Sequence, residues 1–83
     1  DRAEAYLEKT ILSSDETIKL IIDKKIEYQS VEISIYDISG ALLNKKNFTT
    51  GDINLEAINL GKGVKIVTAR IGSFIFVDKI IIR

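Results

Sequence analysis

The sequence predicts an all-β protein, a small antiparallel β-sandwich of Ig-like or Greek-key type with about seven short strands. Isoleucine, valine and threonine are frequent, and β-branched side chains fit a pleated, half-buried surface better than a helix. Turn-forming residues separate the apolar runs, and no run has the length and spacing of a crossover helix. Short strands joined by hairpins therefore explain the pattern best.

The segment before residue 30 is the least regular part of the chain. Residues 17–22, with the sequence Thr-Ile-Lys-Leu-Ile-Ile, are predicted as a strand because polar clusters bound them on both sides. Residues 6–12 are predicted as one extended strand, although helix-forming residues occupy positions 2–9. Residues 1–12 are thus either a linker or the first strand.

A hairpin is predicted around a turn that begins at Asp37. The strand before it alternates apolar and polar residues, and the side chains expected to point inward are Val31, Ile33 and Ile35. The Asp37 side chain can accept hydrogen bonds from the backbone two residues on, and Gly40 tolerates a positive φ. The returning strand is expected over residues 41–48.

Two more strands follow the hairpin. A short strand carries Ile53 and Leu55, and the sequence Leu-Gly-Lys-Gly at residues 60–63 predicts a loop. The strand expected over residues 64–71 offers apolar surface on both faces, which favours a central position. One face carries Val64, Ile66 and Thr68, and the other carries Val67, Ala69 and Ile71.

The last run, residues 74–83, follows a turn at Gly72 and Ser73 and reaches the end of the chain. A chain end is usually disordered unless contacts hold it. The aliphatic residues of this run are too apolar to remain in water, so we expect a folded end: Val77, Ile80, Ile81 and Ile82. Phe74 and Phe76 are expected to help fill the core.

Composition limits the class of protein. With 83 residues, 46% hydrophobic and 29% charged, the chain is expected to form one domain over residues 1–83. Twelve basic residues balance twelve acidic ones without a basic cluster, which argues against nucleic acid as a partner. No apolar run approaches the roughly 20 residues of a transmembrane segment. The absence of Met, and a start at Asp1 without a leader, favour a portion excised from a longer precursor.

Catalysis is not expected, because the chain has no His and no Cys. We predict no catalytic, cofactor-binding or metal-binding residues. The acidic residues in predicted loops are better explained by turns and solubility than by calcium binding: Asp15, Glu16, Asp37 and Asp52. The loop at residues 60–63 lacks the Gly-x-x-x-x-Gly-Lys-Ser/Thr pattern and the following helix of a phosphate-binding loop. Packing explains Tyr28, Tyr36 and Phe48 better than an aromatic platform for sugars.

Two motifs occur in a fixed order before the last hairpin. Tyr36-Asp37 is followed by Gly40, and Leu60 is followed by Gly63-Val64. Together with an apolar final strand that ends on a basic residue, they resemble the C-terminal sorting domain (CTD) of cargo of the type IX (Por) secretion system of Bacteroidetes, over nearly the whole chain. The chain departs from this pattern at Lys65, where the family usually has Tyr, and in lacking the Pro-Asn-Pro common near the first strand.

The resemblance implies a non-catalytic secretion signal that directs a folded periplasmic cargo to the outer-membrane translocon and the cell surface. The partners that it implies are the translocon, the shuttle and sortase components of the system, and the parent cargo protein, without a cofactor. In many members a sortase removes the domain. The implied location is the periplasm in transit, and then the outer membrane, the cell surface or the medium.

A secretion signal without catalytic groups is recognised by its folded shape and its exposed surface. We therefore expect the receptor to contact the folded last strand. The candidate recognition residues are Lys79, Ile80, Ile81, Ile82 and Arg83. Pairing of a partner strand with an open edge is one route to recognition. The alternative function is an Ig-like adhesion or carbohydrate-binding module of a surface protein, which would depend on loops or an aromatic face.

Overall fold

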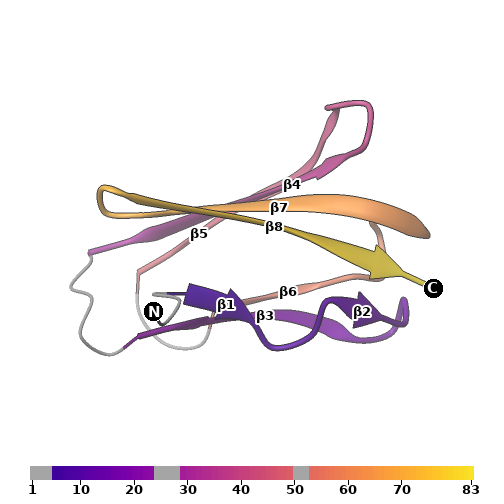
Figure 1. The fold of residues 1–83 in the computed structure, drawn as a ribbon, viewed down its shortest axis with the longest axis horizontal. Helices are drawn as coiled ribbons and strands as arrows, with labels where there is room; N and C mark the ends of the chain where they lie inside the picture. Colours follow the sequence, from indigo (N-terminus) through magenta and orange to yellow (C-terminus); the bar gives the residue numbers. More distant parts are fainter. Residues whose placement is uncertain (1–4, 24–28, 50–52) are drawn as a thin grey trace.

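The computed structural model describes residues 5–23, 29–49 and 53–83, and these residues form eight β-strands in two layers (Figure 1). The strands are β1 (Ala5–Leu7), β2 (Ile11–Leu12), β3 (Thr17–Ile22), β4 (Val31–Asp37), β5 (Leu42–Phe48), β6 (Ile53–Glu56), β7 (Gly63–Ile71) and β8 (Phe74–Ile82). None of the described residues forms a helix, so none provides a helix able to cross a bilayer.

The strands form two sheets that face each other as a sandwich. One sheet has the order β1-β3-β6, and the other has the order β2-β8-β7-β4-β5. All neighbours are antiparallel except β2 and β8, which run parallel. Two facing sheets of mainly antiparallel strands form a β-sandwich, here with three strands in one sheet and five in the other. The predicted fold class is confirmed.

The core lies between the two sheets and consists almost entirely of aliphatic side chains. Its largest fully buried members are Leu12, Ile18, Val31, Ile33, Ile35, Val67, Ile71, Ile80 and Ile82. Along β1, β3, β6 and β7 the buried positions recur at every second residue, as in the pattern BeB of β1 and BiBe of β6. The inward orientation predicted for the first strand of the hairpin is confirmed. Each sheet therefore has one core face and one outer face.

The first strand is not continuous, which corrects the prediction of one strand over residues 6–12. The chain bends after Leu7, where the Glu8 N–H donates to the Lys19 carbonyl oxygen at 2.9 Å, and β2 then joins the other sheet. Leu7 and Leu12 are both buried although they are five positions apart, which is an odd spacing. In a straight strand they would project to opposite faces. Switching sheets lets both side chains reach the core.

The central position predicted for residues 64–71 is confirmed, because β7 pairs with β4 on one side and with β8 on the other. Its second apolar face, however, is not buried in the core. The side chains of Val67, Ala69 and Ile71 are buried, whereas Val64 is exposed and Ile66 is half-buried. The three-stranded sheet packs against only one face of the five-stranded sheet, so the other face of β7 lies at the molecular surface.

Candidate functional site

The end of β8 is held in the sheet from both sides. Toward β7, Ile80 lies opposite Lys65 and Ile81 lies opposite Val64. Toward β2, the Ile81 N–H donates to the Thr10 carbonyl oxygen at 2.8 Å, and the Arg83 N–H donates to the Leu12 carbonyl oxygen at 2.8 Å. Residues 79–83, which the sequence singled out for recognition and which we call the recognition segment, therefore lie between two neighbouring strands that fix their shape.

Burial alternates along this segment. Ile80 and Ile82 are 0% and 1% exposed and belong to the core, whereas Lys79, Ile81 and Arg83 are exposed. The expectation that all the aliphatic residues of the last run are buried is thus wrong for Ile81 and for Val77. Phe74 and Phe76 are half-buried and pack against the core. A strand in a two-layer sandwich can bury only every second residue, whatever the hydropathy of the others.

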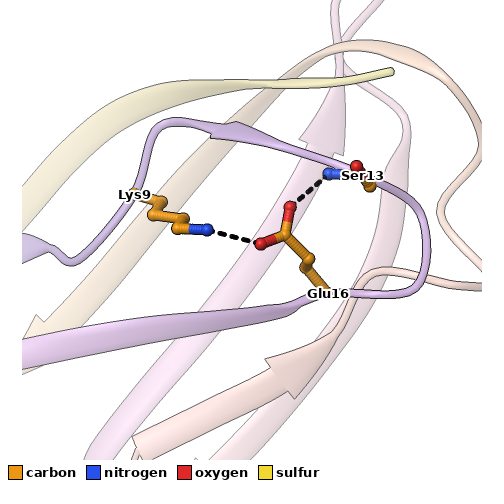
Figure 2. Close-up of polar contacts among 3 residues, drawn as sticks. All are labelled: Lys9, Ser13 and Glu16. Carbon is orange, nitrogen blue, oxygen red and sulfur yellow. Dashed lines mark hydrogen bonds and ion pairs between the residues drawn. The ribbon is translucent and has the colours of Figure 1, made fainter.

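A carboxylate clamp closes the turn that leads out of β2 (Figure 2). Glu16 accepts a hydrogen bond from the Lys9 ammonium at 2.6 Å with one oxygen and from the Ser13 N–H at 2.7 Å with the other. The Glu16 N–H also donates to the Ser13 carbonyl oxygen at 3.0 Å. Because Lys9 and Ser13 flank β2, the clamp fixes the strand that lies beside the end of β8.

The clamp changes the protonation equilibria of its members. The hydrogen bond from Lys9, followed by the one from the Ser13 N–H, lowers the pKa of Glu16 below its usual value of 4.5, and the hydrogen bond to Glu16 raises the pKa of Lys9. Sequence analysis assigned Glu16 only to turn formation and solubility. The signal for the clamp was the spacing Ser-x-x-Glu, in which a glutamate can reach back to the serine N–H.

The first family motif forms the β4–β5 turn, as predicted. One carboxylate oxygen of Asp37 accepts hydrogen bonds from the Ser39 N–H at 2.9 Å, the Ser39 hydroxyl at 2.6 Å and the Ala41 N–H at 3.0 Å. Gly40 adopts a φ of 94°, a conformation that favours glycine. These hydrogen bonds, with that from the Ser39 hydroxyl first, lower the pKa of Asp37.

The second motif shapes the start of β7. Leu60 is buried and its N–H donates to the Ala57 carbonyl oxygen at 3.1 Å, and Gly63 adopts a φ of 112°. Lys65, which stands where the family usually has Tyr, is buried on the inner face, and its ammonium donates to the Lys62 carbonyl oxygen at 3.3 Å. The lysine thus keeps its stem in the core and its charge at the loop.

The two motifs meet on the outer face beside the recognition segment. Val64 lies directly opposite Ile81, and in the next row Tyr36 lies opposite Ile66, which lies opposite Lys79. Directly opposite residues in a sheet project to the same face. Tyr36 and Val64 therefore lie on the same surface as Ile81 and Lys79, although the sequence separates them widely.

A family model described as "Secretion system C-terminal sorting domain" matches residues 14–83. The chain belongs to this family. The match includes both motifs and all of β3 to β8, whereas β1, β2 and Lys9 of the clamp precede it. No curated protein sequence matches the chain at a significant level. The sorting domain is thus identified by its family as a secretion signal of the type IX system, which Bacteroidetes use.

Membership in the family decides the function in outline. The sorting domain is the type IX secretion signal of a cargo protein, and such a signal implies export through the outer membrane, to the cell surface or the medium. The adhesion or carbohydrate-binding alternative has no support. Tyr36 lies on the outer face whereas Phe48 lies opposite the inward-facing Val31, so these two rings do not form one aromatic platform. Tyr28 falls outside the described residues. Among the described residues no three metal-ligating side chains gather; Asp52 lies outside them.

Acidification is expected to destabilise the sorting domain through its clamp. Because the folded pKa of Glu16 is lowered, the unfolded chain binds more protons as the pH falls, and stability decreases with it. The contribution is complete above the usual glutamate pKa of 4.5 and is lost as the pH falls below that value. The measurement is the urea midpoint from neutral to acid pH. Glu16→Gln should flatten this dependence.

Asp15→Asn is the matched control for the acid experiment. Asp15 adjoins the clamp and is exposed, and its carboxylate makes no hydrogen bond or ion pair with another described residue. This variant should keep the dependence of the parent chain. An equal flattening in both variants would show that the clamp does not produce the effect.

Proposed function

We propose that residues 1–83 act as one sorting domain whose last strand is read by the secretion machinery in its folded form. The observation that supports this proposal is the fixation of β8 by β7 on one side and by β2 on the other. Within the recognition segment, Ile80 and Ile82 set the position of the strand, and Lys79, Ile81 and Arg83 present the contacts. Folding and recognition thus depend on alternate residues.

The receptor in this proposal is the outer-membrane translocon, with shuttle and sortase components acting on the same cargo. The domain passes through the periplasm attached to its parent protein, and the cargo then reaches the outer membrane and the cell surface or the medium. Family membership supports this route. The sorting domain supplies no chemistry, since a chain without His and Cys lacks the usual general base and the strongest nucleophile.

Side chains, rather than strand pairing, carry the recognition in this proposal. In the described residues β2 pairs with β8 only at Ile81 and Ile82, so most of that edge has no neighbouring strand. An incoming strand would need the outward N–H groups of this edge. The Lys79 N–H already donates to the Asp78 carboxylate at 2.8 Å, which removes one of them.

Charge reversal at Arg83 tests the proposal in a reporter assay. Residues 1–83 are fused to a periplasmic reporter in a Bacteroidetes host with a type IX system, and reporter activity outside the cell is measured. The parent fusion should be exported. We expect Arg83→Glu to lower export by about tenfold, the effect of losing roughly 1.4 kcal/mol of binding free energy.

Lys19→Glu is the matched control, because Lys19 is also an exposed cation and lies on a strand of the opposite sheet. It should be exported like the parent fusion. A parent fusion that stays in the periplasm would contradict the sorting function itself. Export of Arg83→Glu at the parent level would contradict the role of Arg83.

A further inference from the structure

The outer face of the five-stranded sheet is a large exposed apolar surface. Figure 1 shows that the second sheet lies against the opposite face, and in the described residues no other element lies over the outer face. Its exposed side chains are Ile11 (51%), Leu42 (52%), Val64 (37%), Ile75 (60%), Val77 (62%) and Ile81 (40%). A patch of this kind on a small protein marks an interaction surface.

Strand register places these side chains next to one another. The row across the end of the sheet contains Ile11, Ile81 and Val64. The next row contains Lys79, Ile66, Tyr36 and Leu42. Ile75 and Val77 continue the surface along β8. The patch therefore begins at the recognition segment and is continuous with the residues that the proposed function assigns to contact with the receptor.

The polar residues of the outer face give it a positive charge. It carries the exposed cations Lys45, Arg70 and Lys79 and the half-buried Glu32, whose carboxylate lies 3.6 Å from the Lys45 ammonium. Arg70 and Lys79 have no acidic partner within ion-pair distance among the described residues. Because acidic and basic residues balance over the whole chain, this excess is a property of the face.

A shallow hollow of about 230 Å³ lies in the middle of this face. Its lining is mostly polar or charged: Glu32, Ser34, Tyr36, Lys45, Thr68, Ala69, Arg70 and Ile75. The hollow is smaller than the roughly 300–1,000 Å³ of pockets that hold small molecules. Its size suits a single large side chain of the kind that anchors a protein interface.

We infer that the outer face docks a protein of the secretion machinery that presents apolar side chains interspersed with Asp or Glu and inserts one large side chain into the hollow. This inference rests on the proposed function. Stiff β-branched side chains lose little entropy on binding.

The size and charge of the face favour this occupant. The molecule measures 34 × 23 × 22 Å, so one face is comparable with the ~800 Å² that each partner buries in a standard interface. A second copy of the chain would bring the unpaired Arg70 and Lys79 of both copies together. An anionic bilayer surface is usually held by clusters of about 4–8 basic residues. Neither fits this face as well as an acidic protein surface does.

The test compares two pairs of substitutions in the exported reporter fusion. Ile75→Ser with Val77→Ser removes two anchors from the outer face, and both side chains are solvent-exposed, so the fold should remain. Tyr6→Ser with Ile21→Ser is the matched control, because these exposed residues lie opposite each other on the other sheet. We expect the first pair to lower export at least about tenfold and the second to leave it unchanged.

The outcomes separate this inference from the proposed function. If the parent fusion is not exported, the proposed function fails and this inference fails with it. If the parent is exported and the outer-face pair is exported equally well, only the inference is overturned. Equal losses in both pairs would also overturn it. A urea titration of each 83-residue chain confirms that the two pairs differ in export and not in stability.

Two measurements on the purified chain decide between a protein and the other occupants. The parent chain and the outer-face pair are compared by sedimentation velocity and by binding to vesicles of phosphatidylcholine with phosphatidylglycerol. A monomer that does not bind the vesicles supports the inference. A dimer, or binding to the vesicles, that disappears in the outer-face pair would overturn it.

Discussion

Deleting Lys79–Arg83 is expected to unfold the sorting domain and to abolish export of its cargo. The deletion removes Ile80 and Ile82, which are fully buried, and takes away the strand against which β2 pairs. Truncation of one buried Ile to Ala already costs about 2–5 kcal/mol. Loss of two, with their backbone pairing, is comparable with the whole 5–15 kcal/mol that typically stabilises a domain, and small domains lie near the lower limit.

Circular dichroism with urea unfolding measures the first effect, and the reporter fusion measures the second. The control is removal of Arg83 alone, which leaves the core intact and loses the backbone hydrogen bond to Leu12. That bond contributes about 0.5–1.5 kcal/mol, so the control should still unfold cooperatively. A chain of residues 1–78 that unfolds cooperatively and is exported would contradict both the fold and the sorting role assigned to β8.

Ile80→Ala and Ile81→Ala are expected to differ strongly in stability although they change adjacent, chemically identical residues. Ile80 is enclosed between the sheets, so its truncation leaves a cavity and should cost about 2–5 kcal/mol. Ile81 is exposed on the outer face, and its truncation should cost about 1 kcal/mol or less through reduced strand packing. Urea midpoints of the two variants measure the difference.

The same two variants separate folding from recognition. At a temperature where both remain folded, Ile81→Ala should lower export more than Ile80→Ala, because only Ile81 reaches the surface that we propose as the docking site of the receptor. Equal stabilities would show that both side chains lie in similar surroundings. Export that follows stability alone would show that Ile81 makes no contact with the machinery.

Local rules were sufficient for the turns and for the strands that have one polar face. The turn at Asp37 was predictable because its hydrogen bonds join residues within four positions of each other. The positive φ values of Gly40 and Gly63 follow from glycine being the residue that adopts them without strain. Alternation placed Ile33 and Ile35 inside because a strand exposes its two faces to different surroundings.

The division of the first strand and the exposure of Val77 and Ile81 were not predictable in this way. Whether residues 5–12 form one strand or two depends on β3 and β8, the strands that they pair with after the fold has formed. These features depend on contacts distant in sequence.

The sequence by itself determined the class of fold, the turns, the strands from residue 17 onward and the family motifs, because each depends on propensities and hydrogen bonds within a few residues. Tertiary structure alone decided which of two apolar faces meets the core, since a strand such as β8 carries isoleucine on both. It also decided that Tyr36, Val64 and Ile81 share one surface, because pairing between strands, and not spacing along the chain, sets which side chains become neighbours.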